Sequence, residues 1–116
     1  MPFTTPYIFI ASMDVAPEKE ALFNEVYDQE HIPALLKVPG VRAVTRLRTE
    51  SAGFMIGGQR KELTGDGQPR HVAIYEIDSP DVLTSAAWAE AVEIGRWPTE
   101  VRPFTSNRQH IVRAVV

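Results

Sequence analysis

The chain has 116 residues, of which 44% are hydrophobic and 23% charged, and its formal net charge at pH 7 is −3. This length predicts a single domain over residues 1–116, and the balanced composition argues against a disordered chain. A weakly acidic protein has no basic footprint, so we expect no nucleic-acid partner. The absence of cysteine excludes disulfides, thiolate nucleophiles and cysteine-based metal sites.

Nothing in the sequence indicates export or insertion into a membrane. The first residues lack a basic stretch followed by a long apolar run, so a secretory signal is not expected. No apolar segment approaches the roughly 20 residues that a membrane-spanning helix needs. We therefore expect no membrane partner and a cytoplasmic location.

The first part of the chain predicts a strand followed by a helix. Residues 7–13 form a nearly continuous apolar run rich in β-branched and aromatic side chains, which favours a strand buried on both faces. Pro17 suits the first position of a helix, and apolar residues then recur at helical spacing. We expect this helix to run to about His31, with a boundary or a kink at Ile32, because Pro33 disfavours helical geometry there.

The middle of the chain predicts a second strand and then a long connection. Residues 41–48 alternate between two faces, as a strand does. Residues 50–69 hold most of the glycines, so we expect a long glycine-containing loop here, with a short hairpin extension around residues 54–56. A loop of this length inside a compact domain is more often functional or disordered than neutral.

The second half of the chain repeats this order of elements. Residues 71–77 predict a strand, Ser79 and Pro80 suit the N-cap and first position of a helix, and residues 83–94 carry its apolar stripe. The valine-rich residues 109–116 predict a final strand. The order β-α-β, loop, β-α-β indicates an α+β, ferredoxin-like sandwich, with a four-stranded antiparallel sheet and two helices on one face.

The two helices cover only one face of this sheet, and the other face is also expected to be apolar. Both alternating sets of side chains in residues 7–13 are apolar, and residues 71–77 show a similar pattern. A large exposed apolar face marks an interaction surface, so we expect a homodimer that pairs through the sheet faces. The alternative is a monomer whose open face is covered by its own loop and C-terminal segment.

A motif at the end of the first helix adds a resemblance to a known group. Residues 27–33 read YDQEHIP and residues 36–41 read LKVPGV. With the βαββαβ order, this segment resembles the dimeric α/β-barrel superfamily, and more narrowly its EthD-like and small uncharacterised members. The resemblance implies a homodimer with a pocket in each subunit between helices and sheet. Members include cofactor-independent monooxygenases, polyketide cyclases, small lyases and haem-degrading enzymes, so the fold transfers and the activity does not.

His31 is the candidate catalytic residue. It continues the apolar stripe of the first helix, and an imidazole there can act as a general acid or base, or hydrogen-bond a ligand. The alternative is a structural histidine that interacts with the helix C-terminus. Tyr27, four residues earlier, is a substrate-binding candidate through its hydroxyl group, with a packing tyrosine as the alternative.

Three arginines form a second candidate cluster. Arg42, Arg46 and Arg48 alternate onto the strand face that we expect to lie away from the helices. They would bind a carboxylate or phosphate, with Arg46 as a substrate-binding candidate, or form ion pairs with Glu76 and Asp78 on the neighbouring strand. The sequence favours the ion pairs.

Trp88 is a further substrate-binding candidate, because its indole would suit an aromatic pocket. Trp97 has the same potential, although anchoring of the following proline against the body of the protein is the alternative. The three histidines, His31, His71 and His110, fit no metal-ligand spacing, so we expect no metal site. No cofactor motif is present.

These observations lead to one functional hypothesis and two alternatives. The first is a cofactor-independent enzyme of oxygenase, cyclase or lyase type, which acts on a small aromatic or polyketide-like substrate with His31 as acid or base. The second is a non-catalytic protein that binds a small apolar or aromatic molecule in the same pocket. The third is a structural dimer whose pocket is filled by its own side chains.

Overall fold

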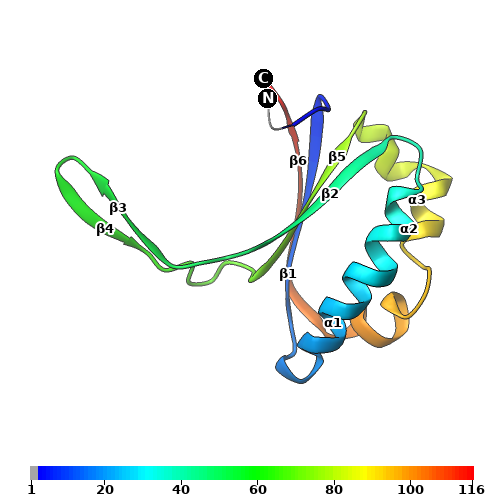
Figure 1. The fold of residues 1–116 in the computed structure, drawn as a ribbon, viewed down its shortest axis with the longest axis horizontal. Helices are drawn as coiled ribbons and strands as arrows, with labels where there is room; N and C mark the ends of the chain where they lie inside the picture. The colour runs from blue at the N-terminus through cyan, green and yellow to red at the C-terminus, as the bar shows by residue number, and fades with distance from the viewer. Residues whose placement is uncertain (1–2) are drawn as a thin grey trace.

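The computed structural model describes residues 3–116, and its centre is a four-stranded antiparallel sheet. The strands lie in the order β2-β5-β1-β6 and comprise β1 (Tyr7–Val15), β2 (Val41–Arg48), β5 (His71–Ile77) and β6 (Thr105–Ala114). All helices lie on one face of this sheet and leave the other face open (Figure 1). The expected βαββαβ sandwich of ferredoxin-like type is therefore confirmed.

The first helical segment is continuous but irregular. It comprises a 3-10 turn (Pro17–Lys19), α1 (Glu20–Val26), a π-helical turn (Tyr27–His31) and α2 (Ile32–Leu36). The irregularity expected next to Pro33 is present, but the helix resumes after it instead of ending. Pro33 is the second residue of α2 and directly follows the π-helical turn, so its missing amide falls where the regular hydrogen-bond pattern of the helix is already interrupted.

The second helical segment is shorter than expected. A 3-10 turn (Pro80–Thr84) precedes α3 (Ala86–Ala91), and Ser85 between them is extended, with ψ 153°. Its side chain accepts a hydrogen bond from the Trp88 amide (3.1 Å), so Ser85 acts as a new N-cap that interrupts the helix. Ile94 lies beyond α3 and is 50% exposed, so its predicted place in a buried stripe is wrong. Within residues 3–116, no helix is long and apolar enough to cross a membrane.

A β-bulge in β2 reverses the faces predicted for its arginines. Val41 pairs with Ile77 and Ala43 with Glu76, so the strand gains one residue at Arg42. One extra residue moves every later side chain to the opposite face. Arg46 therefore points to the helices, and the prediction that these arginines face away from them is wrong.

The main core lies between the sheet and the helical layer. Its largest fully buried side chains come from both layers: Tyr75, Phe23, Leu35, Ile77, Val26 and Val101. A π-helical turn (Trp97–Val101) and a 3-10 turn (Arg102–Phe104) complete the helical layer and lead into β6.

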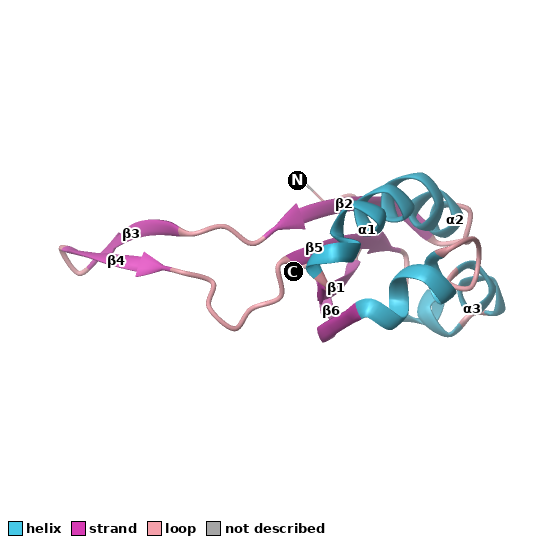
Figure 2. Ribbon diagram, turned by 90° about the horizontal axis from the view of Figure 1, so that it is seen from below, coloured by secondary structure: helices cyan, strands magenta, loops and turns pink. Residues whose placement is uncertain are grey.

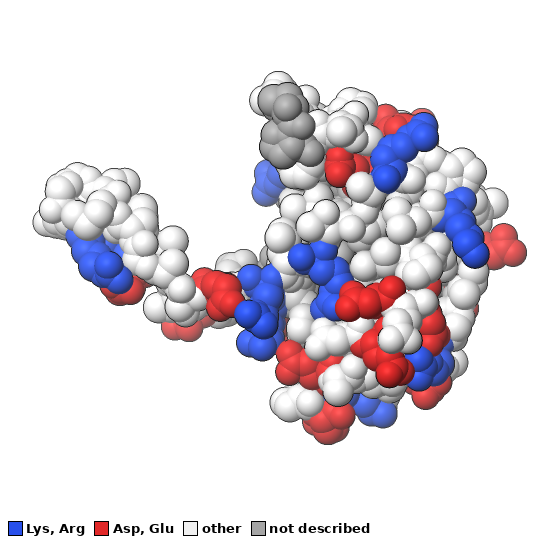
Figure 3. Space-filling view, viewed as in Figure 1, with Lys and Arg blue, Asp and Glu red and all other residues white. Residues whose placement is uncertain are grey.

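Part of the predicted loop at residues 50–69 forms a projecting hairpin, which we call the arm. Its strands are β3 (Ala52–Ile56) and β4 (Gln59–Leu63), and every residue in them is exposed. Gly57 and Gly58 have φ values of 59° and 75°, as a tight hairpin turn requires. The arm leaves the sheet away from the helices (Figures 1 and 2), and its outer end is mostly uncharged in the view of Figure 3.

The turn before β2 gives a test of the packing. Gly40 has a φ of 93°, and a Cβ atom there would meet Cγ2 of Val82 at 2.5 Å. Gly40→Ala therefore combines backbone strain with a steric clash, and we expect a loss of about 2–3 kcal/mol in the free energy of unfolding, measured by urea denaturation. The control is Gly58→Ala, where φ is 75° and no atom lies within 4 Å, so that only backbone strain of about 1 kcal/mol is expected. Equal losses in both variants would contradict the close contact with Val82.

Candidate functional site

A cavity of about 280 Å³ lies between the sheet and the helical layer. Three of the predicted site residues, His31, Tyr27 and Trp88, line it together. Phe9 of β1 and His110 of β6 contribute to its wall from the sheet. The structure therefore brings the first helical segment, α3 and the sheet together around one space.

The π-helical turn positions two of these side chains. Tyr27 and His31 are its first and last residues, and both are buried. Their rings make an edge-to-face contact with centroids 4.9 Å apart, while the ring of Trp97 stacks on His31 at 4.2 Å. Two aromatic neighbours thus fix the orientation of the imidazole. Single π turns inside helices occur frequently at functional sites.

The imidazole of His31 is buried without a polar partner. The residue is 5% exposed, and its Nδ1 atom has no hydrogen-bond partner among the described residues. Burial, followed by the positive charges of Arg102 and Arg108, lowers the pKa of His31 to about 4. The ring is therefore neutral at pH 7. A buried polar atom without a partner costs about 1–3 kcal/mol, so its presence calls for an explanation other than stability.

Two tyrosines provide a hydrogen-bond donor beside His31. The hydroxyl groups of Tyr27 and Tyr75 lie 2.6 Å apart, and both rings line the cavity. Burial raises the pKa of Tyr27 to about 12 and that of Tyr75 well above its usual value, so both phenols stay protonated. The pair holds two hydroxyl protons and its mutual hydrogen bond uses one. The second is available to a ligand in the cavity.

Trp88 adds a flat aromatic wall. Its indole makes edge-to-face contacts with Phe9 at 5.7 Å and with Tyr75 at 5.6 Å. The ring is partly exposed, as expected for a side chain at the edge of a cavity. These contacts hold the indole in place before any ligand binds.

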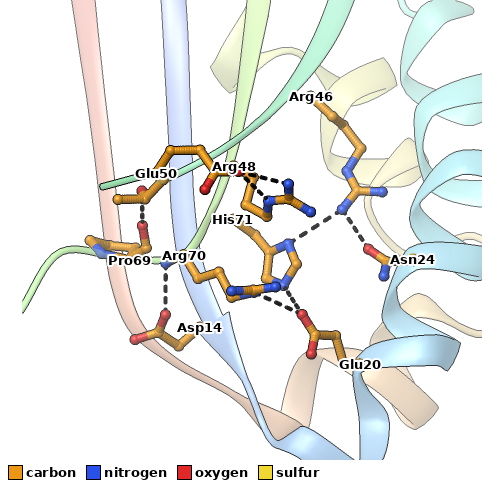
Figure 4. A network of polar contacts seen from close by, with 10 residues as sticks. Asp14, Glu20, Asn24, Arg46, Arg48, Glu50, Pro69, Arg70 and His71 are labelled. Atoms are coloured by element: carbon orange, nitrogen blue, oxygen red, sulfur yellow. Dashed lines mark hydrogen bonds and ion pairs between the residues drawn. The ribbon is translucent and has the colours of Figure 1, made fainter. Parts of the chain in front are cut away.

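Arg46 does not line this cavity. It lies in a separate cleft of about 240 Å³ at the base of the arm, shown in Figure 4. Its guanidinium donates hydrogen bonds to Asn24 (2.7 Å) and Asp28 (3.0 Å), and lies 5.1 Å from the centre of the Tyr27 ring. Arg46 therefore ties β2 to the first helical segment from the side of the cleft.

The other arginines predicted in this cluster also have carboxylate partners. Arg42 pairs with Asp78, as expected, and Arg48 pairs with Glu50. Since Arg46 pairs with Asp28, all three support the ion-pair interpretation rather than a preformed anion site. These pairs are largely exposed, so each contributes little to stability.

His71 is a buried histidine of a different kind from His31. Its Nε2 lies 3.1 Å from Glu20, and its Nδ1 lies 3.4 Å from the guanidinium of Arg46. Because an arginine can only donate, Nδ1 accepts and Nε2 carries the proton. Burial lowers the pKa of His71, so it is a neutral, paired structural residue.

Four residues with polar side chains in the cavity wall were not predicted as site residues from the sequence: Tyr75, Arg102, Arg108 and His110. His110 stacks on Phe9 with ring centroids 5.8 Å apart. Arg108 and His110 are two residues apart in β6, so strand alternation gives the signal that places both on one face. Arg108 was missed because the last strand was expected to begin only at residue 109.

The buried state of His31 can be tested through the pH dependence of stability. A folded-state pKa of about 4, against an ordinary value of 6.5, means that the unfolded chain takes up the proton first as the pH falls. Stability is then lost between pH 6.5 and pH 4, by up to about 3 kcal/mol for this group. We expect His31→Phe to show a smaller loss than the wild type when urea denaturation at about pH 7 and about pH 4 is compared.

The other histidines and the paired carboxylates are present in both proteins, so their contributions cancel in this comparison. At about pH 7, His31→Phe should be at least as stable as the wild type, since it removes an unpaired polar atom. The same loss in both proteins on acidification would show that His31 is not a buried neutral group.

Comparisons with known proteins find similarity at the level of structure. No family model matches the chain, and no curated protein matches it. An EthD family protein from Bacillus halodurans C-125 matches with a TM-score of 0.58 and 14% identity, over 95% of this chain and 99% of that one. The heme-degrader MhuD from Mycobacterium tuberculosis, with two hemes in its active site, matches with a TM-score of 0.61 and 16% identity, over 96% of each chain.

A variant of MhuD with two manganese protoporphyrin IX groups per active site gives a TM-score of 0.64 at 15% identity, over 96% of this chain and 95% of that one. Identities of this size establish a shared fold and leave the activity open. The fold that the resemblance implied is confirmed: this chain shares the ferredoxin-like fold of the EthD family protein and of MhuD.

Proposed function

We propose that the protein is a cofactor-independent enzyme that binds a small aromatic or polyketide-like compound in the cavity and moves a proton on it through His31. The observation that carries this proposal is the place of His31, which lines an open cavity together with Tyr27 and Tyr75 and whose Nδ1 has no partner among the described residues. A structural histidine is normally paired, as His71 is. Because Nδ1 itself is closed off from solvent, a ligand in the cavity would meet the imidazole through its other nitrogen, Nε2.

The groups around the cavity suit the removal of a proton next to a carbonyl. The neutral imidazole of His31 accepts the proton, while the free hydroxyl of the Tyr27–Tyr75 pair donates to the carbonyl oxygen as it gains negative charge. Trp88 packs against the ring. Removal of such a proton can begin oxygenase-, cyclase- and lyase-type reactions of enolisable ring compounds.

The low pKa of His31 sets a condition on this chemistry. Free His31 is a weak base because burial and two arginines disfavour its charged form. A negatively charged ligand in the cavity would offset the arginines and raise that pKa towards neutrality. The substrate itself would therefore make His31 a better base.

The size of the cavity limits the ligand. At about 280 Å³ it is slightly smaller than the roughly 300–1,000 Å³ typical of small-molecule pockets. One or two fused rings fit this volume and a tetrapyrrole does not. The cavity therefore does not fit the haem that MhuD binds.

A second candidate function is that of a non-catalytic binding protein. The observation in its favour is again the pKa of about 4, which suits a neutral hydrogen-bonding contact better than a base. The open cavity counts against the third hypothesis, a structural dimer with a filled pocket.

Turnover separates the enzyme from the binding protein. A panel of aromatic and polyketide-like compounds is incubated with wild type, His31→Phe and His71→Gln, and substrate loss is followed by mass spectrometry. We expect His31→Phe to lose roughly 10²- to 10⁴-fold in rate, as for loss of a general base. His71→Gln, which alters a histidine outside the cavity, should retain activity. Equal turnover by wild type and His31→Phe would remove His31 as the catalyst, and binding without turnover would favour the binding protein.

We further propose that a second copy of the chain covers the open face of the sheet. Ile10 in β1 pairs in register with Ile74 in β5 and Ile111 in β6, so three isoleucines form a row across that face. Ile111 is 44% exposed, and Leu47 on the same face is 45% exposed. An apolar sheet face of this kind supports two-fold pairing.

The arm lies on the same side of the sheet as this open face (Figure 1). A second copy packed on the sheet would therefore lie beside it. The arm also carries exposed apolar side chains, with Phe54 at 42% and Ile56 at 57% exposure. A lone two-stranded hairpin is at best marginally stable in water, so such a contact would stabilise it.

The proposed dimer is tested by light scattering after size exclusion. We expect the wild type to elute with the mass of a dimer and Ile10→Glu with about half that mass, because a carboxylate in the centre of the face cannot be buried without a partner. Ala21→Glu introduces the same charge at an exposed position of α1 and should remain dimeric. A monomeric wild type would overturn the proposal.

A further inference from the structure

The charged groups around the cavity are all of one sign. Its wall contains the guanidinium groups of Arg102 and Arg108 and no aspartate or glutamate. The cleft that holds Arg46 differs, because Glu20 lies in its wall. Arg108 is an exposed residue, so water screens part of its charge, but no carboxylate in the wall of the cavity competes for it.

The two arginines of the cavity are not equivalent. Arg102 donates to both carboxylate oxygens of Glu93 and to the carbonyl oxygen of Val92 (2.7 Å), so its charge is balanced by the protein. Arg108 has no carboxylate partner within residues 3–116, and its one recorded hydrogen bond is a long contact of 3.4 Å to the hydroxyl of Thr105.

This lack of a partner is unusual among the arginines of the chain. The sequence contains nine arginines, and seven of them form ion pairs within the described residues: Arg42, Arg46, Arg48, Arg60, Arg70, Arg96 and Arg102. The remaining two, Arg108 and Arg113, lie on opposite faces of β6, because Arg113 pairs in register with Ile8 of the open face. Arg108 is thus the arginine left available to the cavity.

The positive charge of Arg108 acts on two histidines that line the cavity. It contributes to lowering the pKa of both His31 and His110, although burial is the larger cause for each. Arg108 and His110 are separated by one residue in β6, and the ring of His110 stacks on Phe9. A bound anion at Arg108 would therefore lie next to an aromatic surface.

We propose that the cavity is selective for a ring compound that carries one carboxylate, with Arg108 as the residue that binds this group. This inference deepens the proposed function and rests on it, since it names the class of ligand. The carboxylate pairs with the guanidinium of Arg108, which can donate two parallel hydrogen bonds to it. The ring packs against Phe9 and Trp88, and the polar end of the ligand meets His31 and the tyrosine pair.

The experiment compares two probes of nearly the same shape, of which one carries a negative charge and the other is neutral. Binding of 1-naphthoate and of 1-naphthamide is measured by calorimetry for the wild type, Arg108→Gln and Arg113→Gln. Both tryptophans of the chain line the cavity, so changes in their indole N–H signals in NMR spectra locate the bound probe. Arg113→Gln is the matched control, because it removes the same charge from the same strand on the other face of the sheet.

We expect the wild type and Arg113→Gln to bind the naphthoate about tenfold more tightly than the naphthamide, and Arg108→Gln to bind both equally. The preference should shrink in high salt, as screening of a partly exposed ion pair predicts. A preference that survives in Arg108→Gln would overturn the assignment of Arg108.

Two further outcomes separate this inference from the proposed function. Equal binding of both probes by the wild type, with shifted tryptophan signals, would leave the ring-binding cavity in place and overturn the selectivity for an anion. No binding of either probe would overturn both.

Discussion

The hydrogen bond between the hydroxyl groups of Tyr27 and Tyr75 joins the first helical segment to the middle of the sheet. Both rings are buried, so a hydroxyl that lost this contact would be left without a partner, at about 1–3 kcal/mol. The contact therefore fixes how closely the helical layer can approach β5. Tyr27 also separates two environments, since it lines the cavity while the guanidinium of Arg46 lies over its ring.

These two environments use arginine in opposite ways. In the cleft beside α1, the guanidinium groups meet carboxylates of the same chain, and the result is a network that connects β2, β5 and α1 (Figure 4). In the cavity, carboxylates are absent from the wall and one guanidinium is left unbalanced. The ion pairs of the cleft connect elements of the fold to one another. The arrangement in the cavity leaves one guanidinium without a carboxylate partner, in the wall of the same cavity where the Nδ1 atom of His31 has no partner among the described residues.

The overall architecture could be predicted because it depends on patterns that extend over many residues. The nearly continuous apolar run at residues 7–13, two prolines at helix starts and the motif at residues 27–33 all agree on a βαββαβ sandwich. His31, Tyr27 and Trp88 were expected near one pocket, and the structure places them around one cavity.

The errors come from single-residue events that have no periodic signal. The bulge at Arg42 moves Arg46 to the other face of β2, and the extended backbone of Ser85 interrupts a helix whose apolar spacing continues through it. Tyr75 could not be assigned to the cavity because its position depends on a contact 48 residues away in sequence, with Tyr27. Local patterns indicate which face a residue occupies and not which side chains meet across the layers.

The π-helical turn depends on one extra residue in the chain. Its amide-to-carbonyl contact spans five residues, from Ile32 back to Tyr27, whereas an α-helix spans four. The turn therefore holds one residue more than a regular helix would need. Because this residue is accommodated as a local bulge, α1 and α2 keep the faces that a regular helix would give them. The irregularity is thus confined to Tyr27–His31, the segment whose first and last side chains line the cavity.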